Sequence, residues 1–224
     1  MPYSFESTFT DLPEVLPLFP LGRVLLLPRA RLPLNLFENR YLHMLDYALC
    51  HGRSIGIIQP SVKLKKNSDS KNPNLYEIGC AGYITAFSQT NDNRYEIILK
   101  GLCRFKVISE LELKNGFRRA NVCWNSYEND FKILGLKDKK MRINFVTILK
   151  KYLKKVSINA DWEAIEMSTD EDLINSISMG CPFDQNEKQA LLEAKCLDER
   201  AEILISLMKM SLVENLVAGS SLSS

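Results

Sequence analysis

The chain opens with short apolar runs that proline, glycine and arginine interrupt. These runs are Leu16–Phe19, Val24–Leu27 and Leu32–Leu36. Because proline lacks a backbone N–H, it tends to lie at the ends of strands or on the edge strands of a sheet. The pattern therefore predicts three short β-strands.

Beyond these runs, apolar residues recur at every third or fourth position. From about Glu38 this spacing predicts a helix with one apolar face, made of Tyr41, Leu42, Leu45, Ala48 and Leu49. We expect the helix to end near His51 and Gly52, because glycine readily takes the left-handed conformation that stops a helix. The apolar run Ile55–Ile58 then predicts a buried strand.

Alternating patterns and turn residues continue to about residue 124. They predict four more strands, Leu75–Ser88, Arg94–Lys100, Phe105–Ile108 and Ala120–Trp124. The dipeptide Asn115-Gly116 is a strong signal for a tight turn between the last two. Glycine often marks the bulges at which a sheet bends, so Gly79 and Gly82 favour a small, strongly bent β-barrel.

The pattern changes from strands to helices near residue 128. We expect helices at about 136–156, 161–167, 169–178 and 185–194, and a last helix from about 198. Ser168 or Thr169 is suited to cap the third of these, and Asp184 with Glu187 forms a capping-box pattern before the fourth. The predicted fold class is α+β, with a β-barrel and one helix over residues 12–127 and an all-helical bundle over residues 128–218.

The same periodicities identify candidate core residues. Each of them lies on the apolar face of its predicted strand or helix. In the β part we expect Leu45, Leu49, Ile57, Ile97 and Leu99, and in the helical part Phe145, Leu149 and Leu204.

Composition describes an ordinary globular protein. Apolar residues make up 46% of the 224 residues and charged residues 25%. No run of 18 apolar residues is present, so the sequence predicts no transmembrane helix. The first fifteen residues include acids but neither lysine nor arginine, which is not the pattern of a secretory or transit peptide. We therefore expect a cytoplasmic protein.

Nothing in the pattern of cysteine and histidine predicts a metal or a cofactor. The six cysteines are dispersed without a C-x-x-C pair, and the two histidines, His43 and His51, lie far from such a pair. Zinc sites usually show closely spaced ligand pairs. Most of the cysteines lie in apolar patterns, so we expect them to act as reduced, small hydrophobic residues.

Motifs for nucleotide hydrolysis and for a serine nucleophile are missing from these 224 residues. Neither G-x-x-x-x-G-K-[ST] nor G-x-S-x-G occurs, and no catalytic residue is predicted. A cluster of four lysines at residues 150–155 could contact RNA. However, its one interleaved aromatic residue, Tyr152, lies on the predicted core face, whereas base stacking needs exposed aromatic rings. A solvated helix face is the simpler interpretation.

One family resemblance extends over about residues 12–212. The stretch LPLFPLGRVLLLPRARLPLNLFENRY resembles the opening of the Lon protease N-terminal domain, especially its stand-alone bacterial versions. The likeness rests on Pro17, Pro20, Gly22, Pro28, Pro33-Leu34, Phe37-Glu38 and Arg40-Tyr41. Two later blocks agree with it: YEIGCAG together with GLCRF, and EKQALLE. Asn39 is a departure, since the stand-alone proteins often carry proline at this first helical position.

The resemblance implies a PUA-like β pseudo-barrel followed by helices, and a role in binding. In full-length Lon proteases, ATPase and Ser-Lys peptidase modules follow the similar domain, which is implicated in substrate engagement and assembly. We therefore hypothesise a non-catalytic recognition protein for polypeptide segments or a protein partner, with its oligomeric state left open. Two alternatives remain: an RNA-binding PUA-like module, and a small-molecule enzyme of unknown type.

A candidate peptide-binding segment lies at the turn into the first helix. A β part and a helical part that are joined once should leave a crevice, and such crevices are preferred ligand sites. Phe37 and Tyr41 could offer apolar area there, while hydrogen-bonding groups could orient a peptide backbone, from Asn35, Glu38 and Arg40. The alternative is that Phe37 and Tyr41 belong to the core and that Glu38 and Arg40 form an ion pair at the helix start.

Overall fold

A computed structural model of the chain describes residues 9–61, 73–91, 94–133 and 135–220. The chain divides into two compact units, Met1–Lys132 and Ile133–Ser224, which we call the β unit and the helical unit. The domain bounds expected above, 12–127 and 128–218, stay a prediction.

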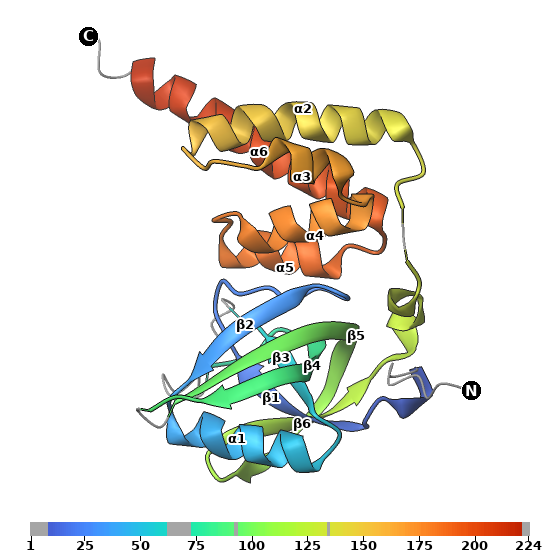
Figure 1. Cartoon of the computed structure of the whole chain (residues 1–224), viewed down its shortest axis with the longest axis vertical. Coiled ribbons are helices and arrows are strands. Elements are labelled where there is room, and N and C mark those ends of the chain that lie inside the picture. Colours follow the sequence, from blue (N-terminus) through green and yellow to red (C-terminus); the bar gives the residue numbers. More distant parts are fainter. Residues whose placement is uncertain (1–8, 62–72, 92–93, 134, 221–224) are drawn as a thin grey trace. The chain divides into compact units, whose positions relative to one another are not determined.

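The β unit is built on one strongly bent sheet. Its elements are η1 (Phe9–Asp11), β1 (Val15–Pro20), β2 (Arg31–Leu36), α1 (Asn39–Cys50), β3 (Ser54–Ile58), β4 (Ile78–Gln89), β5 (Tyr95–Lys114), β6 (Phe117–Cys123) and η2 (Asn125–Phe131) (Figure 1). The strand order is β2-β5-β4-β3-β1-β6, and β6 also pairs with β5. Five strands therefore close into a ring. Strand β2 lies outside the ring and pairs with the first part of β5. Only the β1–β3 pair is parallel among the strand pairs of the described residues.

Strand β5 is continuous over 20 residues, from Tyr95 to Lys114. Its first part pairs with β2 and β4, and its last part pairs with β6. The sequence predicted two strands here, Arg94–Lys100 and Phe105–Ile108, and that prediction is wrong. The strand bends instead of breaking, because a register shift opposite Ala81 and Gly82 absorbs the change of partner.

The bend in β5 lies at Gly101, beneath the segment that leads into β2. A Cβ atom at Gly101 would stand 2.0 Å from the carbonyl oxygen of Leu27. The Gly101 N–H donates to the Ala30 carbonyl and its own carbonyl accepts from the Arg29 N–H, both over 2.8 Å. Only glycine lets the two backbones lie this close.

The predicted strand Val24–Leu27 is not a strand. Leu25, Leu26 and Leu27 are buried, as their apolar character indicates, but they join no ladder. Arg23 and Arg29, at the two ends of the segment, have positive φ angles of 62° and 65°. The chain therefore turns at both ends, and the segment buries its side chains without pairing its backbone.

Helix α1 confirms the predicted periodicity and packs against β1, β3 and β6. Its buried residues are Tyr41, Met44, Leu45 and Ala48. The chain leaves the helix through Gly52, with φ +86°, as expected for a helix stop. Leu49, a predicted core residue, is only half-buried, whereas Met44 is fully buried and was not predicted.

The centre of the β unit is filled by Phe105. Its ring lies against Gly56 and Gly79, where added Cβ atoms would stand 2.9 Å and 2.5 Å from it, and its centroid lies 5.9 Å from that of Trp124. The predicted core residues of this unit other than Leu49 are buried: Leu45, Ile57, Ile97 and Leu99. Asn115 and Gly116 turn β5 into β6 with positive φ angles of 49° and 84°, which confirms that hairpin.

A buried ion pair holds η2 against β5. Arg104 and Asp130 are 5% and 3% exposed. The guanidinium donates to both carboxylate oxygens, Nη2 to Oδ1 over 2.7 Å and Nε to Oδ2 over 2.9 Å, and the Arg104 N–H donates to Oδ2 over 2.9 Å. Tyr127 lies under the guanidinium, 4.7 Å from it. Because each charge is matched, the pair can remain out of water.

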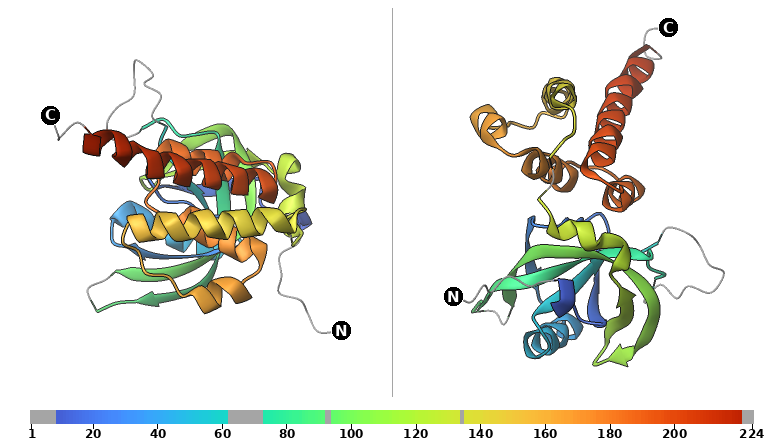
Figure 2. Two further views of the ribbon diagram at one scale, coloured as in Figure 1. Left: turned by 90° about the horizontal axis from the view of Figure 1, so that it is seen from above. Right: turned by 90° about the vertical axis from the view of Figure 1, so that its right-hand side faces the viewer.

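The described part of the helical unit contains α2 (Lys139–Lys155), α3 (Trp162–Met167), α4 (Asp170–Gly180), α5 (Gln185–Glu193) and α6 (Leu197–Ser220). Figure 2 shows α2 and α6 side by side. Thr169 and Asp184 cap α4 and α5, and the capping box with Glu187 is present. The predicted core residues Phe145, Leu149 and Leu204 are buried. The α+β class is thus confirmed; within the described ranges no helix is both long and apolar enough to cross a membrane.

Substituting Gly101 with alanine should destabilise the β unit strongly. The added methyl group would meet the Leu27 backbone, which cannot move aside as a flexible side chain could. We expect a loss of about 3 kcal/mol or more in the free energy of unfolding, measured by urea denaturation followed by circular dichroism.

Gly180→Ala is the matched control for that measurement. Gly180 lies at the end of α4 with no atom within 4 Å of an added Cβ, so the change should be neutral or slightly stabilising. Equal stability of the Gly101→Ala protein and its parent would contradict the close approach.

Removing one partner of the buried ion pair should also be costly. In Asp130→Ala the Arg104 charge stays buried without its carboxylate, and we expect a loss of roughly 3–5 kcal/mol in unfolding free energy. Glu110→Ala, which breaks the more exposed pair with Arg118, should lose no more than about 1 kcal/mol. Similar losses in the two variants would show that the buried pair has no special role.

Candidate functional site

The structure brings the predicted site residues together around one hollow of about 320 Å³. Five of its lining residues are the predicted ones, Asn35, Phe37, Glu38, Arg40 and Tyr41. The others are Phe19, Pro20, Leu21, Leu34 and Leu36. All of them belong to the β unit, so this hollow needs no second unit to form. The crevice expected between the β and helical parts stays a prediction.

Tyr41 forms a buried wall of the hollow. It is 9% exposed, and its ring lies 4.2 Å from that of Phe19 between centroids. Burial raises the pKa of Tyr41 above its ordinary value, an effect that the Arg40 charge opposes. The alternative assignment of Tyr41 to the core is therefore correct, although one side of the residue lines the hollow.

Glu38 and Arg40 form the expected ion pair at the start of α1. Arg40 Nη2 lies 2.8 Å from Glu38 Oε2, and the Arg40 guanidinium also stacks 4.6 Å above the Tyr41 ring. Glu38 is the N-cap residue, yet its carboxylate caps no N–H of the helix. With side chains 42% and 44% exposed, the pair contributes at most about 1 kcal/mol to stability. It is therefore free to exchange partners with a ligand at little cost.

Phe37 is not part of the core. It is 64% exposed, and the guanidinium of Arg94 lies 5.8 Å from its ring centroid. Aromatic residues, phenylalanine included, are enriched in binding interfaces relative to the rest of a protein surface. The core assignment is thus wrong for Phe37, which is available to a ligand.

Asn35 belongs to a row of polar side chains that crosses three strands. The register places it opposite Glu96, which in turn lies opposite Ser88. All three are exposed, and their side chains form no hydrogen bond with any described residue. The neighbouring row is apolar and consists of Pro33, Ile98 and Ala86.

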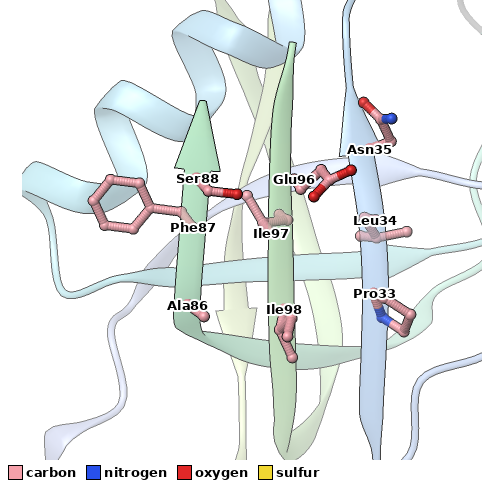
Figure 3. Close-up of a pocket in the computed structure, with 9 residues that line it drawn as sticks. All are labelled: Pro33, Leu34, Asn35, Ala86, Phe87, Ser88, Glu96, Ile97 and Ile98. Carbon is pink, nitrogen blue, oxygen red and sulfur yellow. The ribbon is translucent and has the colours of Figure 1, made fainter. Parts of the chain in front are cut away.

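These two rows line a second hollow of about 480 Å³, shown in Figure 3. It shares Leu34 and Asn35 with the first hollow, so β2 borders both. The sequence prediction missed the residues that β4 and β5 contribute, Ala86, Phe87, Ser88, Glu96, Ile97 and Ile98. One signal was available: Ile98 is apolar at a position where the alternation of β5 requires a polar residue, and it is 37% exposed.

Among the described residues, the surroundings of two buried cysteines and one histidine are well defined. No group of three or more His, Cys, Asp or Glu side chains in the described part of the chain could hold a metal ion. Burial raises the pKa of Cys103 to about 12 and that of Cys181 to about 11, so both stay protonated at neutral pH. His51 stacks on Tyr47, 4.0 Å between centroids, with Nδ1 2.7 Å from the Tyr47 carbonyl oxygen.

The lysine cluster of α2 is partly engaged within the helical unit. Lys150 lies 5.4 Å from the Trp162 ring centroid, and Lys155 donates to the Ser211 carbonyl. Tyr152 is 3% exposed on the core face, as predicted, and burial raises its pKa to about 12. The ring of Tyr152 is therefore not exposed for an RNA base to stack on.

Three comparisons with known proteins agree with one another. A family model described as the ATP-dependent protease La (LON) substrate-binding domain matches residues 15–210. A Lon protease of Dictyoglomus thermophilum is 25% identical over 195 residues, which cover 86% of this chain and 24% of that protein. Lon protease 2 of Myxococcus xanthus is 25% identical over 204 residues, covering 88% and 24%. The chain thus spans about a quarter of the length of these relatives.

Two solved structures share the fold. A Lon N-terminal domain protein from Xanthomonas campestris superposes with a TM-score of 0.59 at 21% identity, covering 86% of this chain and 97% of that one. The N-terminal domain of a Mycobacterium avium complex Lon protease superposes with a TM-score of 0.62 at 14% identity, covering 87% and 98%. Both likenesses therefore extend over β and helical parts alike.

The burial of Tyr41 predicts that the β unit loses stability at alkaline pH. Above pH 10 the tyrosines of the unfolded chain release their protons, while Tyr41 in the folded protein keeps its own to a higher pH. The folded state then binds more protons, so the free energy of unfolding falls as pH rises. In Tyr41→Phe the fall between pH 9 and pH 11, measured by urea denaturation, should be smaller; an identical fall would contradict the prediction.

Proposed function

This chain belongs to the LON substrate-binding domain family, and on that premise we propose that it is a recognition protein that binds segments of other polypeptides. In this role the residues of the chain bind a polypeptide and catalyse no reaction. In it the hollow beside β2 and the start of α1 is the contact surface for the bound segment.

One observation carries this proposal: an exposed aromatic ring stands beside an exposed amide side chain and an exposed ion pair. Phe37 is 64% exposed, and the Asn35 side chain has no partner among the residues the structure describes. If a ligand covered the exposed part of Phe37, apolar burial would contribute about 3 kcal/mol before the cost of ordering the ligand. Asn35 and the Glu38–Arg40 pair would then orient the ligand's amide groups.

Replacing Phe37 with serine should weaken binding without affecting the fold. The probe is a fluorescently labelled α-lactalbumin that has been reduced and carboxymethylated so that it stays unfolded, and the measurement is fluorescence anisotropy. We expect an affinity about tenfold or more below that of the parent, because exposed aromatic residues dominate such interfaces. The melting temperature should be nearly unchanged, since an exposed side chain contributes little to stability.

Ile143→Ser is the matched control for Phe37→Ser. Ile143 lies on α2 in the helical unit and is 68% exposed, so the chemical change and the exposure are similar. Its affinity for the probe should equal that of the parent. An equal loss in both variants would indicate a general effect of surface hydrophobicity instead of a defined site.

The polar side of the hollow is tested with Asn35→Ala combined with Arg40→Ala. Both residues are exposed, so folding should be preserved, and thermal melting checks this. If the folded double variant binds the unfolded probe as tightly as the parent, the segment is scaffold and the site lies elsewhere. Repeating the titration at higher salt separates apolar contact, which tolerates salt, from contact between charges, which salt screens.

A further inference from the structure

Strand β2 has one free edge. It pairs with β5 along its whole length, from Arg31 opposite Lys100 to Leu36 opposite Tyr95. No other strand of the described residues pairs with it, and it stands at the end of the strand order. Figure 3 shows it as the outermost of three adjacent strands. The backbone groups on its outer side therefore lack the ladder partners that a further strand would supply.

The register determines which groups these are. In an antiparallel pair, successive residues alternate between facing the partner and facing away. The Gly101 N–H donates to the Ala30 carbonyl, so the backbone of Ala30, and likewise that of every second residue after it, faces β5. The backbone groups of Arg31, Pro33 and Asn35 consequently face outward.

Pro33 fits this assignment. Proline has no N–H and would break a ladder bond if it faced β5, whereas on the outer side it only removes one donor from the free edge. The outer edge thus offers an N–H and a carbonyl from Arg31, a carbonyl from Pro33, and an N–H and a carbonyl from Asn35.

We propose that the bound polypeptide adds to the free edge of β2 as an extended, antiparallel strand. This inference rests on the proposed function and specifies how the ligand would be held. Main-chain hydrogen bonds would supply sequence-independent affinity, and alternate side chains would reach the two hollows that β2 borders. A binding mode of this kind suits a protein that recognises many unfolded segments.

The neighbouring side chains define the chemistry of the preferred segment. Its residue opposite Pro33 would extend the apolar row of Ile98 and Ala86, so an apolar side chain fits there. Its residue opposite Arg31 would meet two cations, since Arg31 lies opposite Lys100 and neither forms an ion pair with a described residue. An acidic side chain complements that end, and a polar one fits beside Asn35.

A second copy of this chain is a poorer occupant of the same edge. If two copies paired their β2 strands about a two-fold axis through Pro33, so that Arg31 of each lay opposite Asn35 of the other, the two Pro33 residues would face each other. Neither could donate, and both carbonyls would remain without a partner. A segment without proline at that position can use every outward group.

A peptide with a single backbone methyl group tests the strand pairing directly. The labelled parent peptide has threonine, valine, isoleucine, valine and glutamate in that order, flanked by serines, so that isoleucine lies opposite Pro33 and glutamate opposite Arg31. Methylating the isoleucine nitrogen removes the donor to the Pro33 carbonyl, and affinity should fall about tenfold or more. Methylating a neighbouring valine nitrogen, which points away from β2, should change affinity less than about threefold.

The protein offers a complementary pair of variants. Asn35→Ala removes only the side chain, whereas Asn35→Pro also removes the outward N–H and leaves the pairing of β2 with β5 intact. The proline variant should bind the parent peptide about three- to tenfold more weakly than the alanine variant. Should the proline variant fail to fold, the two methylated peptides still decide the question.

The outcomes separate this inference from the proposed function. Equal effects of the two methyl groups, or equal affinities of the folded alanine and proline variants, would overturn strand addition. So would failure of the peptide to bind while unfolded α-lactalbumin still binds in a Phe37-dependent way, although the proposed function would survive. If neither probe binds, both proposals fail. A dimer of the parent protein that Asn35→Pro abolishes would identify a second copy of the chain as the occupant of the edge instead.

Discussion

The arrangement of the β unit depends on a single close approach, that of the Leu27 backbone to Gly101. No side chain could lie between them, because an added Cβ would stand 2.0 Å from a carbonyl oxygen. This contact, with its two backbone hydrogen bonds, starts the ladder of β2 on β5 and sets its register. Beyond the same point β5 bends away toward β6, while β2, at the end of the strand order, keeps one paired edge and one free edge. The hollows beside β2 follow from that geometry.

The second part of β5 is held to the rest of the β unit by buried side chains. Phe105 occupies space that Gly56 and Gly79 leave open, and Arg104, the residue before it, binds Asp130 across the surface of the same strand. Adjacent residues of a strand point to opposite faces, so this one segment fills the core with Phe105 and holds η2 through Arg104. Tyr127 and Phe131 of η2 pack against the same core cluster as Phe105. These contacts fix the bend at which β5 changes its partner from β2 to β6. The outer strand β2 can therefore carry exposed groups without destabilising the barrel.

Local signals predicted much of this fold, and the errors lie where non-local pairing decides. Caps such as Asp184 with Glu187, and the Asn115-Gly116 turn, depend on residues a few positions apart, so the sequence reveals them directly. Val24–Leu27 was assigned to a strand because an apolar run cannot show whether its backbone finds a ladder partner. The five candidate site residues are close in sequence and could be predicted together. Glu96 and Ser88, by contrast, join Asn35 only through a register that spans three strands.

An exposed strand edge is a hazard that this chain limits but does not remove. Fully paired edges prevent aggregation, while a free edge of adjacent donors and acceptors invites it. Pro33 interrupts the donors at the middle of β2, and the flanking Arg31 adds a charge, so unselective stacking is disfavoured. However, the outer edge keeps the carbonyl of Pro33 and both the N–H and the carbonyl of Arg31 and of Asn35. Phe37, which follows directly after β2, is an exposed aromatic residue. In the proposed binding mode, both features would serve the reversible addition of a polypeptide segment to β2.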